Sequence, residues 1–170
     1  MNDWLWTELH DLFDTDDGSL PEVRVAFADK RAVITAFAEL RGRGQDVTHR
    51  GSTFWSVAHS KDCPLDSVPN AAALVVSGEA EPFHLVLRGI EMSGVRLPDL
   101  GVWVFDDQVA IDYRMGPEWR AAQLRAPFQL LIKLSRSDPR ASVTLDPKTL
   151  AEVADRFQAC WSRFVSEHGR

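Results

Sequence analysis

The chain has 170 residues, of which 45% are hydrophobic and 26% charged, and its formal net charge is −6. These values are typical of a soluble globular protein, and the length suits a single domain spanning 1–170. No apolar run approaches the roughly 20 residues that cross a bilayer, so we expect no membrane segment.

The N-terminus is acidic and lacks the basic stretch that begins a secretory signal. Cys63 and Cys160 lie far apart and belong to no paired motif. We therefore expect a cytoplasmic protein with reduced thiols, although a single disulfide between the two stays open.

Two helices and a strand are expected in the N-terminal part. Asn2 or Asp3 can cap a first helix, and a polar turn over 14–22 ends it. Alternation over 23–27 predicts a short strand. Asp29 can cap a second helix that stops at Gly42, followed by a loop over 41–46. The apolar residues of the two helices are Leu5, Trp6, Leu9, Leu12 and Phe13, then Val33, Ile34, Phe37 and Leu40.

The pattern is weak between residues 48 and 70. Residues 54–57 fit a strand, and 63–69 look irregular. Two apolar stretches, 73–77 and 83–92, read as further strands.

The segment from Leu97 to Trp119 predicts a β-hairpin whose two turn residues are Asp106 and Asp107. With that turn, Val104 pairs with Val109 and Val102 with Ile111. Side chains alternate across a strand, so one face is apolar and the other is mixed. The predicted core face is Leu100, Val102, Val104, Val109, Ile111 and Tyr113, and the mixed face is Trp103, Phe105, Ala110, Asp112 and Arg114.

Two helices and a strand are expected after the hairpin. Pro117 suits a first helical position, and Pro127 must kink or restart the helix. Residues 128–134 fit a strand as well, but we favour the helix. Residues 142–145 read as a strand. For the last helix, Asp146 and Pro147 can supply a cap and the first turn, and Thr149 with Glu152 offers an overlapping capping box. The apolar stripe of this helix is Leu150, Val153, Ala154, Phe157, Trp161, Phe164 and Val165.

This order of elements is typical of the α+β class. We expect an antiparallel or mixed sheet of about 5–6 strands with helices packed on it. A long C-terminal amphipathic helix completes the predicted fold.

Acidic residues are concentrated at the N-terminus. Seven acids and no Lys or Arg precede Arg24, whereas the remainder holds 18 acids and 19 bases. A solvated helix face explains this pattern, and an acidic surface that meets a basic partner is the alternative. The candidate binding residues in this segment are Glu8, Asp11, Asp14, Asp16 and Asp17.

No catalytic or metal-binding signature is present. The DTDDGS segment fails as a calcium loop, because Phe13 and Arg24 fall where the terminal ligands belong. His49, His59, Cys63 and His84 lack the tight pairs of a zinc site, and a thiol nucleophile at Cys63 shows no orienting group. The serine elbow, phosphate loop and dinucleotide fingerprint are missing as well. We expect no metal, no cofactor and no catalytic residue, and lean against an enzyme.

Six tryptophans are many for this length. Trp4, Trp6 and Trp161 have helical phases that suit a core. Trp55, Trp103 and Trp119 suit either a core or a protein interface.

The leading hypothesis is a non-catalytic protein-interaction module, with an unidentified partner that is basic if the acidic segment is the contact. Small acidic chains of this kind are similar in type to bacterial immunity and adaptor proteins, without a shared motif. The alternative is a small-ligand or hydrolytic site on the mixed hairpin face, using Trp103, Asp112, Arg114 and His84. A homodimer stays open, and the acidity argues against nucleic acid.

Overall fold

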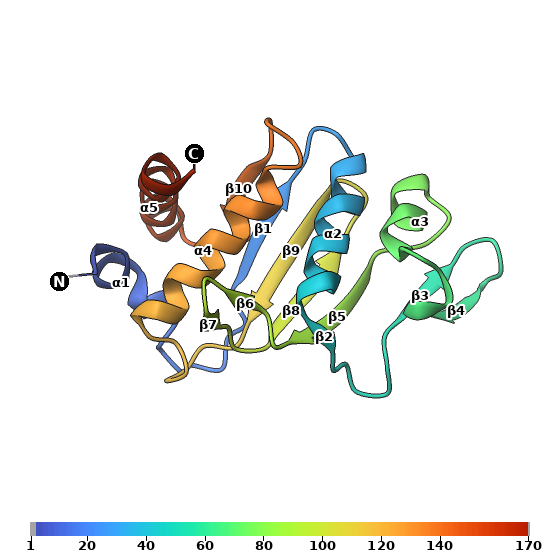
Figure 1. The fold of residues 1–170 in the computed structure, drawn as a ribbon, viewed down its shortest axis with the longest axis horizontal. Helices are drawn as coiled ribbons and strands as arrows, with labels where there is room; N and C mark the ends of the chain where they lie inside the picture. The colour runs from blue at the N-terminus through green and yellow to red at the C-terminus, as the bar shows by residue number, and fades with distance from the viewer. Residues whose placement is uncertain (1–2, 170) are drawn as a thin grey trace.

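A computed structural model describes residues 3–169 as a six-stranded antiparallel sheet with helices on one face (Figure 1). The strand order is β10-β1-β9-β8-β5-β2. The helices are α1 (Trp4–Leu9), α2 (Arg31–Arg43), α3 (Ala71–Ser77), α4 (Ala121–Ser135) and α5 (Ala151–His168), with short 3-10 turns η1 (His10–Leu12) and η2 (Leu65–Ser67). The strands are β1 (Glu22–Ala26), β2 (Gln45–Asp46), β3 (Thr53–Ser56), β4 (Lys61–Pro64), β5 (Phe83–Arg88), β6 (Glu91–Met92), β7 (Val95–Arg96), β8 (Leu100–Val104), β9 (Gln108–Tyr113) and β10 (Ser142–Leu145).

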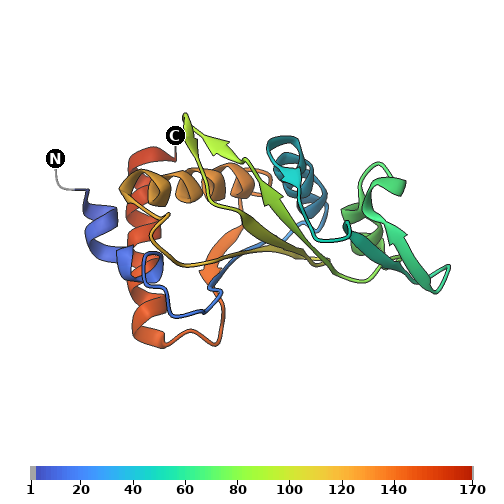
Figure 2. The same cartoon turned by 90° about the horizontal axis from the view of Figure 1, so that it is seen from below.

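Helices α2 and α4 lie on the same side of the sheet (Figure 2). Helices α1 and α5 contact α4 and each other at one end of the molecule, and the β3–β4 hairpin projects at the other end (Figure 1). On the opposite side, the centre of the sheet is uncovered between α5 and that hairpin (Figure 2). The predicted α+β class, strand number and long C-terminal helix are confirmed.

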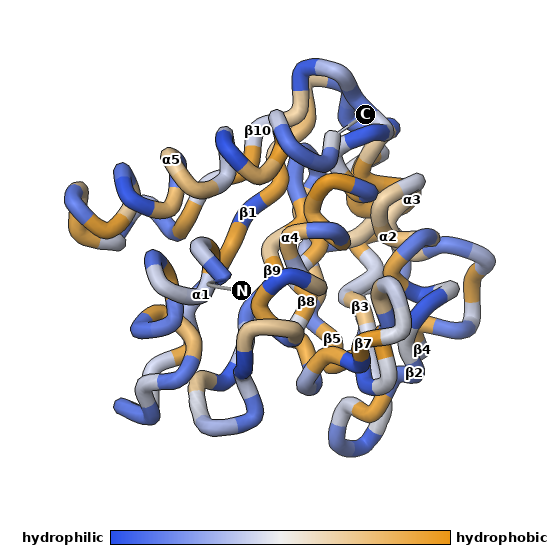
Figure 3. Tube along the Cα trace, turned by 60° about the vertical axis from the view of Figure 1, so that its left-hand side comes forward, coloured by the Kyte–Doolittle hydropathy of each residue, from blue (hydrophilic) through white to orange (hydrophobic). Residues whose placement is uncertain are grey.

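The central hairpin has the predicted register. Val104 pairs with Val109, and Val102 with Ile111. All six side chains of the predicted core face are buried. They belong to the hydrophobic core between the sheet and the helices α2 and α4 (Figure 2). The hydropathy-coloured tube shows strands β8 and β9 as largely hydrophobic (Figure 3).

One end of this core is an aromatic cluster. The rings of Phe13 and Tyr113 stack with centroids 4.6 Å apart, and Trp119 meets both edge-on. The Tyr113 hydroxyl donates a hydrogen bond to the Leu12 carbonyl oxygen (2.9 Å). The N-terminal segment is thereby attached to the end of β9.

The expectation of a strand over 73–77 was wrong, because these residues belong to helix α3. The Asn70 side chain caps the helix by accepting from the Ala72 N–H, and Gly78 ends it in the left-handed conformation. These two capping residues outweigh the β-branched Val75 and Val76 in a short apolar stretch.

Three predicted helix boundaries were also wrong. Helix α2 continues through Gly42 to Arg43, so the expected loop over 41–46 is instead the helix end and strand β2. Helix α4 begins at Ala121 rather than at Pro117, and it accommodates Pro127 internally. Helix α5 begins at Ala151 after Leu150, which is 69% exposed and makes no side-chain cap. Asp146 accepts a hydrogen bond from the Lys148 N–H, but it caps a separate turn before α5 and does not begin the helix.

Other expectations hold in outline. Strands β1, β3 and β10 occupy the predicted stretches, and residues 128–134 are helical. The stretch 63–69 was expected to be irregular, but Cys63 and Pro64 belong to strand β4, and a 3-10 turn follows at Leu65–Ser67. Asp3 caps α1, whereas Asn2 lies outside the described residues. None of the helices within residues 3–169 combines the length and the apolar character needed to cross a membrane.

Candidate functional site

Aromatic side chains gather on the uncovered centre of the sheet. Trp103 is 37% exposed on β8. Its ring centroid lies 4.8 Å from that of His84 on β5 and 6.0 Å from that of Phe105. We refer to His84, Gly101, Trp103, Phe105 and Asp112 as the open-face cluster.

A hydrogen bond between His84 and Asp112 fixes the imidazole in this cluster. Nε2 of His84 donates to Oδ2 of Asp112 over 2.9 Å, and both side chains are partly buried. The two residues lie on β5 and β9, which β8 separates. The bond therefore spans the full width of the middle strand.

Gly101 provides the space for this bond. It pairs with Val86 on one side and with Asp112 on the other. A Cβ atom at position 101 would lie 2.1 Å from Asp112 Oδ1, which is well inside van der Waals contact. Only glycine at this position lets the carboxylate lie across β8 and reach His84.

Charged groups border the cluster on β1. Arg24 forms ion pairs with Glu22 and, over 3.0 Å, with Asp146. The hydrogen bond to Glu22 is the main reason that the pKa of Arg24 is raised above its ordinary value. Arg24 pairs in register with Ala110, which pairs with Trp103, so this charged network lies two strands from the tryptophan.

The pair of His84 and Asp112 orients an imidazole without completing a catalytic set. Nucleophilic catalysis needs a hydroxyl or thiol within hydrogen-bond reach of the base. Among residues 3–169, no Ser, Thr or Cys side chain hydrogen-bonds to His84, and Nδ1 has no partner. The arrangement offers a fixed ring with one unused hydrogen-bonding nitrogen.

Arg114, a predicted member of the mixed face, lies apart from the cluster. Together with Arg88 and Arg96 it lines a groove of about 510 Å³ at the end of the sheet. Trp103 and Asp112 are thus brought together by the fold, and Arg114 belongs to a separate feature.

The acidic N-terminal residues contact helix α5 and their own turn. Asp11 forms an ion pair with Arg156 of α5 (2.7 Å), and Asp14 accepts a hydrogen bond from His10. Hydrogen bonds from Ser19 lower the pKa of Asp17. Glu8 and Asp16 carry no ion pair within the described part of the chain. The ion pair of Asp11 therefore holds this part of the acidic segment against α5.

A hollow of about 430 Å³ lies beside this segment. Asp11, Asp17, Glu22 and Asp146 contribute carboxylates to its wall. Apolar side chains contribute as well, and Leu20 among them is 63% exposed. Asp11 and Asp17 thus place two carboxylates of the acidic segment in the wall of a surface hollow.

The remaining candidate ligands do not converge. His59 hydrogen-bonds to Ser56, His84 to Asp112, and the Cys63 thiol approaches the Lys61 carbonyl. Across residues 3–169, no three His, Cys, Asp or Glu side chains are grouped as metal ligands would be. Cys63 and Cys160 are both free thiols.

The three unassigned tryptophans divide between surface and core. Trp55 and Trp103 are 40% and 37% exposed, whereas Trp119 is 1% exposed and donates from Nε1 to the Arg114 carbonyl. Sequence reasoning gave His84 only a secondary place and missed Gly101. An isolated glycine within a strand pattern was the available signal, because it marks a close approach by another group.

Comparisons with protein-family models, with curated proteins and with solved structures give no match for this chain. The geometry of the described residues is therefore the basis for assigning a function.

Proposed function

We propose that the protein is a non-catalytic protein-interaction module, immunity- or adaptor-like, whose partner docks on the open-face cluster. The observation that supports this is Trp103, an exposed tryptophan between His84 and Phe105 on an uncovered sheet face.

The chemistry of this face matches the anatomy of protein interfaces. Interfaces combine an aromatic centre with a polar rim, and Trp is among the residues most enriched at their energetic hot spots. Here Trp103 and Phe105 provide the centre, and Arg24, Glu22 and Asp112 provide charged groups nearby. The hydrogen bond that His84 donates to Asp112 orients the imidazole before a partner arrives, which lowers the entropy cost of binding.

The partner should carry an apolar side chain over Trp103 and a hydrogen-bonding group for His84 Nδ1. Exposed Glu8 and Asp16 lie outside the cluster on the acidic segment. Such charges accelerate encounter with a basic partner more than they strengthen the final complex. The acidic segment therefore contributes to association rate in this proposal.

Two tryptophan variants test the proposal. The partner is first captured from the native host and purified, and its affinity is then measured by calorimetry. We expect Trp103→Ala to weaken binding by about 30-fold, as for a hot-spot residue of about 2 kcal/mol. Trp55→Ala removes a similarly exposed tryptophan from β3 and serves as the matched control. Equal effects of the two substitutions would overturn the proposal.

A variant of the acidic segment separates the two candidate surfaces. Replacing Glu8, Asp11, Asp14, Asp16 and Asp17 by Gln or Asn should slow association and reduce its salt dependence. If this variant loses all affinity while Trp103→Ala binds normally, the acidic segment is the interface instead. Sedimentation at two protein concentrations shows whether the partner is a second copy of the chain.

A small-ligand or hydrolytic site is the second candidate, and the bond between His84 and Asp112 is the observation that favours it. A carboxylate that orients an imidazole is one part of many hydrolytic sites. Hydrolysis of a model ester that His84→Ala abolishes and Trp103→Ala leaves intact would favour this candidate over the interaction module.

A further inference from the structure

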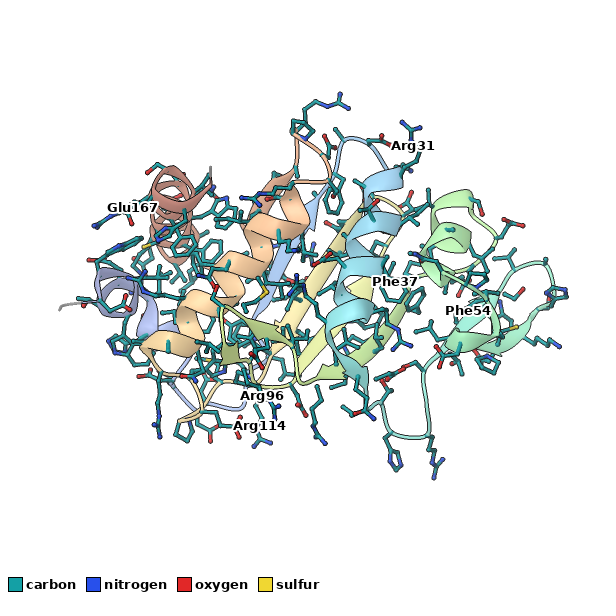
Figure 4. The ribbon with its side chains drawn as sticks, in the orientation of Figure 1. Arg31, Phe37, Phe54, Arg96, Arg114 and Glu167 are labelled. Atoms are coloured by element: carbon teal, nitrogen blue, oxygen red, sulfur yellow. The ribbon has the colours of Figure 1, made fainter. Side chains whose placement is uncertain are left out.

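The groove at the end of the sheet collects positive charge in an acidic protein. Its wall contains three arginines and two carboxylates, whereas the whole chain carries a net charge of −6. The arginines come from separate elements: β5, β7 and the segment after β9. Arg96 and Arg114 are labelled together at the lower edge of the molecule in Figure 4. The charged and amide residues of this wall are Arg88, Arg96, Asp99, Arg114, Glu118 and Gln123.

Two of the three arginines are left without a partner. Arg88 forms a bidentate pair with Asp99, with N–O distances of 3.1 and 2.8 Å, so these two charges satisfy each other. The side chains of Arg96 and Arg114 make no hydrogen bond or ion pair with any residue in 3–169. Each guanidinium has a planar fork of donors that matches the oxygens of a carboxylate or phosphate group.

Gln123 supplies an independent sign of a missing ligand. It lies in the first turn of α4 and lines the same groove. Its Oε1 atom is buried and accepts no hydrogen bond from the described residues. Buried polar atoms in folded proteins are nearly always paired. A rotation of the Gln123 side chain towards the groove would bring this unpaired acceptor within reach of a donor on a bound ligand.

We propose that this groove binds a small organic oxyanion that also carries a hydroxyl or amine group. The carboxylate or phosphate oxygens accept from Arg96 and Arg114, and the hydroxyl or amine donates to Gln123 Oε1 after this side chain turns towards the groove. The volume of about 510 Å³ lies in the usual range for small-molecule sites. This site is separate from the open-face cluster and does not depend on the protein-interaction proposal.

Three probes test the ligand chemistry by calorimetry at low, matched ionic strength. Citrate carries carboxylates and a hydroxyl, tricarballylate is the same molecule without the hydroxyl, and glucose 6-phosphate carries a phosphate with hydroxyls. We expect citrate or glucose 6-phosphate to bind more tightly than about 10 mM, and whichever is tighter identifies the anion class. We expect tricarballylate to bind about tenfold more weakly than citrate. Binding of neither citrate nor glucose 6-phosphate would overturn the proposal.

Variants locate the binding to the groove. Arg96→Gln and Arg114→Gln should each weaken binding by about tenfold or more, because each removes a charged donor. Arg50→Gln makes the same change of net charge at an exposed, unpartnered arginine outside the groove and should leave affinity within about twofold. An equal loss in all three variants would show non-specific attraction and overturn the site.

Gln123→Leu tests the role of the amide. It should remove the preference for citrate over tricarballylate, and a preference that persists would exclude Gln123 as the acceptor. Thermal unfolding of each variant verifies the fold. Trp103→Ala should bind the probes normally, so a failure of the interaction proposal is distinguishable from a failure of this one.

Discussion

Gly101 and Asp112 face each other on β8 and β9, and a methyl group at position 101 would lie 2.1 Å from Asp112 Oδ1. Glycine normally weakens a strand, because it costs backbone entropy and offers no side chain to pack. Here its missing Cβ leaves the room that the carboxylate occupies on its way to His84. Gly101, Asp112 and His84 therefore act as one unit.

Gly101→Ala should lower the free energy of unfolding by about 1–2 kcal/mol, because the new methyl group displaces the Asp112 carboxylate from His84. Urea denaturation measures the change. In an Asp112→Ala background the obstruction is gone, and Gly101→Ala should be neutral or stabilising by up to about 1 kcal/mol, since alanine restricts the unfolded chain. The same destabilisation in both backgrounds would show that the carboxylate is not the obstructing group.

Asp3→Asn should reduce stability at neutral pH and have little effect in acid. Burial alone raises the pKa of Asp3, but hydrogen bonds from Arg125 and the Trp6 N–H outweigh it and hold the pKa below 3.8. The ionised form thus contributes stability above that value, and the contribution is lost as the pH falls through the folded-state pKa.

We expect this difference to be about 0.5–1 kcal/mol in urea unfolding, because Asp3 and Arg125 are partly exposed. Asparagine remains a good helix cap, so the substitution isolates the charge. Asp3→Ala, which removes the cap as well, should cost about 1 kcal/mol more. A loss for Asp3→Asn that does not change with pH would rule out the ion pair as its cause.

Tyr113 should resist ionisation until the protein unfolds. Burial raises its pKa well above the ordinary value of 10. Below about pH 10 the phenol is neutral in both the folded and the unfolded chain, and it does not change the stability. As the pH rises above the ordinary pKa of 10, the unfolded chain loses this proton first, so the folded state loses stability. Tyr113 is the single tyrosine of the chain, so absorbance at the tyrosinate band reports this residue alone. The absorbance rise should coincide with loss of the circular dichroism signal, and a rise before unfolding would contradict burial.

Tyr113→Phe should cost about 1 kcal/mol, because the Leu12 carbonyl loses its hydrogen-bond donor. Chemical denaturation measures this change, and Phe105→Leu on the open face provides a control for altering an aromatic residue elsewhere on the same sheet. A neutral Tyr113→Phe would indicate that water replaces the hydroxyl.

The two cysteines should differ strongly in reactivity towards a thiol reagent. Cys160 is 6% exposed, and burial raises its pKa, so both access and the thiolate fraction are low. Cys63 is partly exposed on the β3–β4 hairpin. One thiol should react promptly and the second only in denaturant. Cys63→Ser should remove the prompt phase, and its persistence would place Cys160 at the surface.

The hairpin of β8 and β9 was predictable because its register depends on a short turn and on local alternation. His84 and Asp112 lie 28 positions apart in sequence. Their hydrogen bond depends on the register of β5 against β8. No turn fixes that register, so sequence placed Trp103 and Asp112 on one face without showing that His84 joins them.

Errors in the helices have a different cause. Helix α3 is short and apolar, so its periodicity does not distinguish a helix from a strand. Its capping residues, Asn70 and Gly78, indicate the helix instead. Helix α4 contains Pro127 in its interior, where local rules place a break. Tertiary packing of Leu124, Phe128 and Leu131 against the core compensates for the hydrogen bond that proline cannot donate. Sequence could not show that the side chains of Arg96 and Arg114 lie in one groove, because the two residues come from β7 and from the segment after β9.

The strand order has a consequence for how this sheet meets other chains. Unpaired edges of a sheet invite added strands and aggregation. Here α5 flanks β10 at one edge, and β2 at the other edge contributes only two residues (Figure 1). Lateral growth is thereby discouraged at both sides. A second molecule that approaches the sheet is directed to its flat side, where contact is made by side chains and can be selective for one partner.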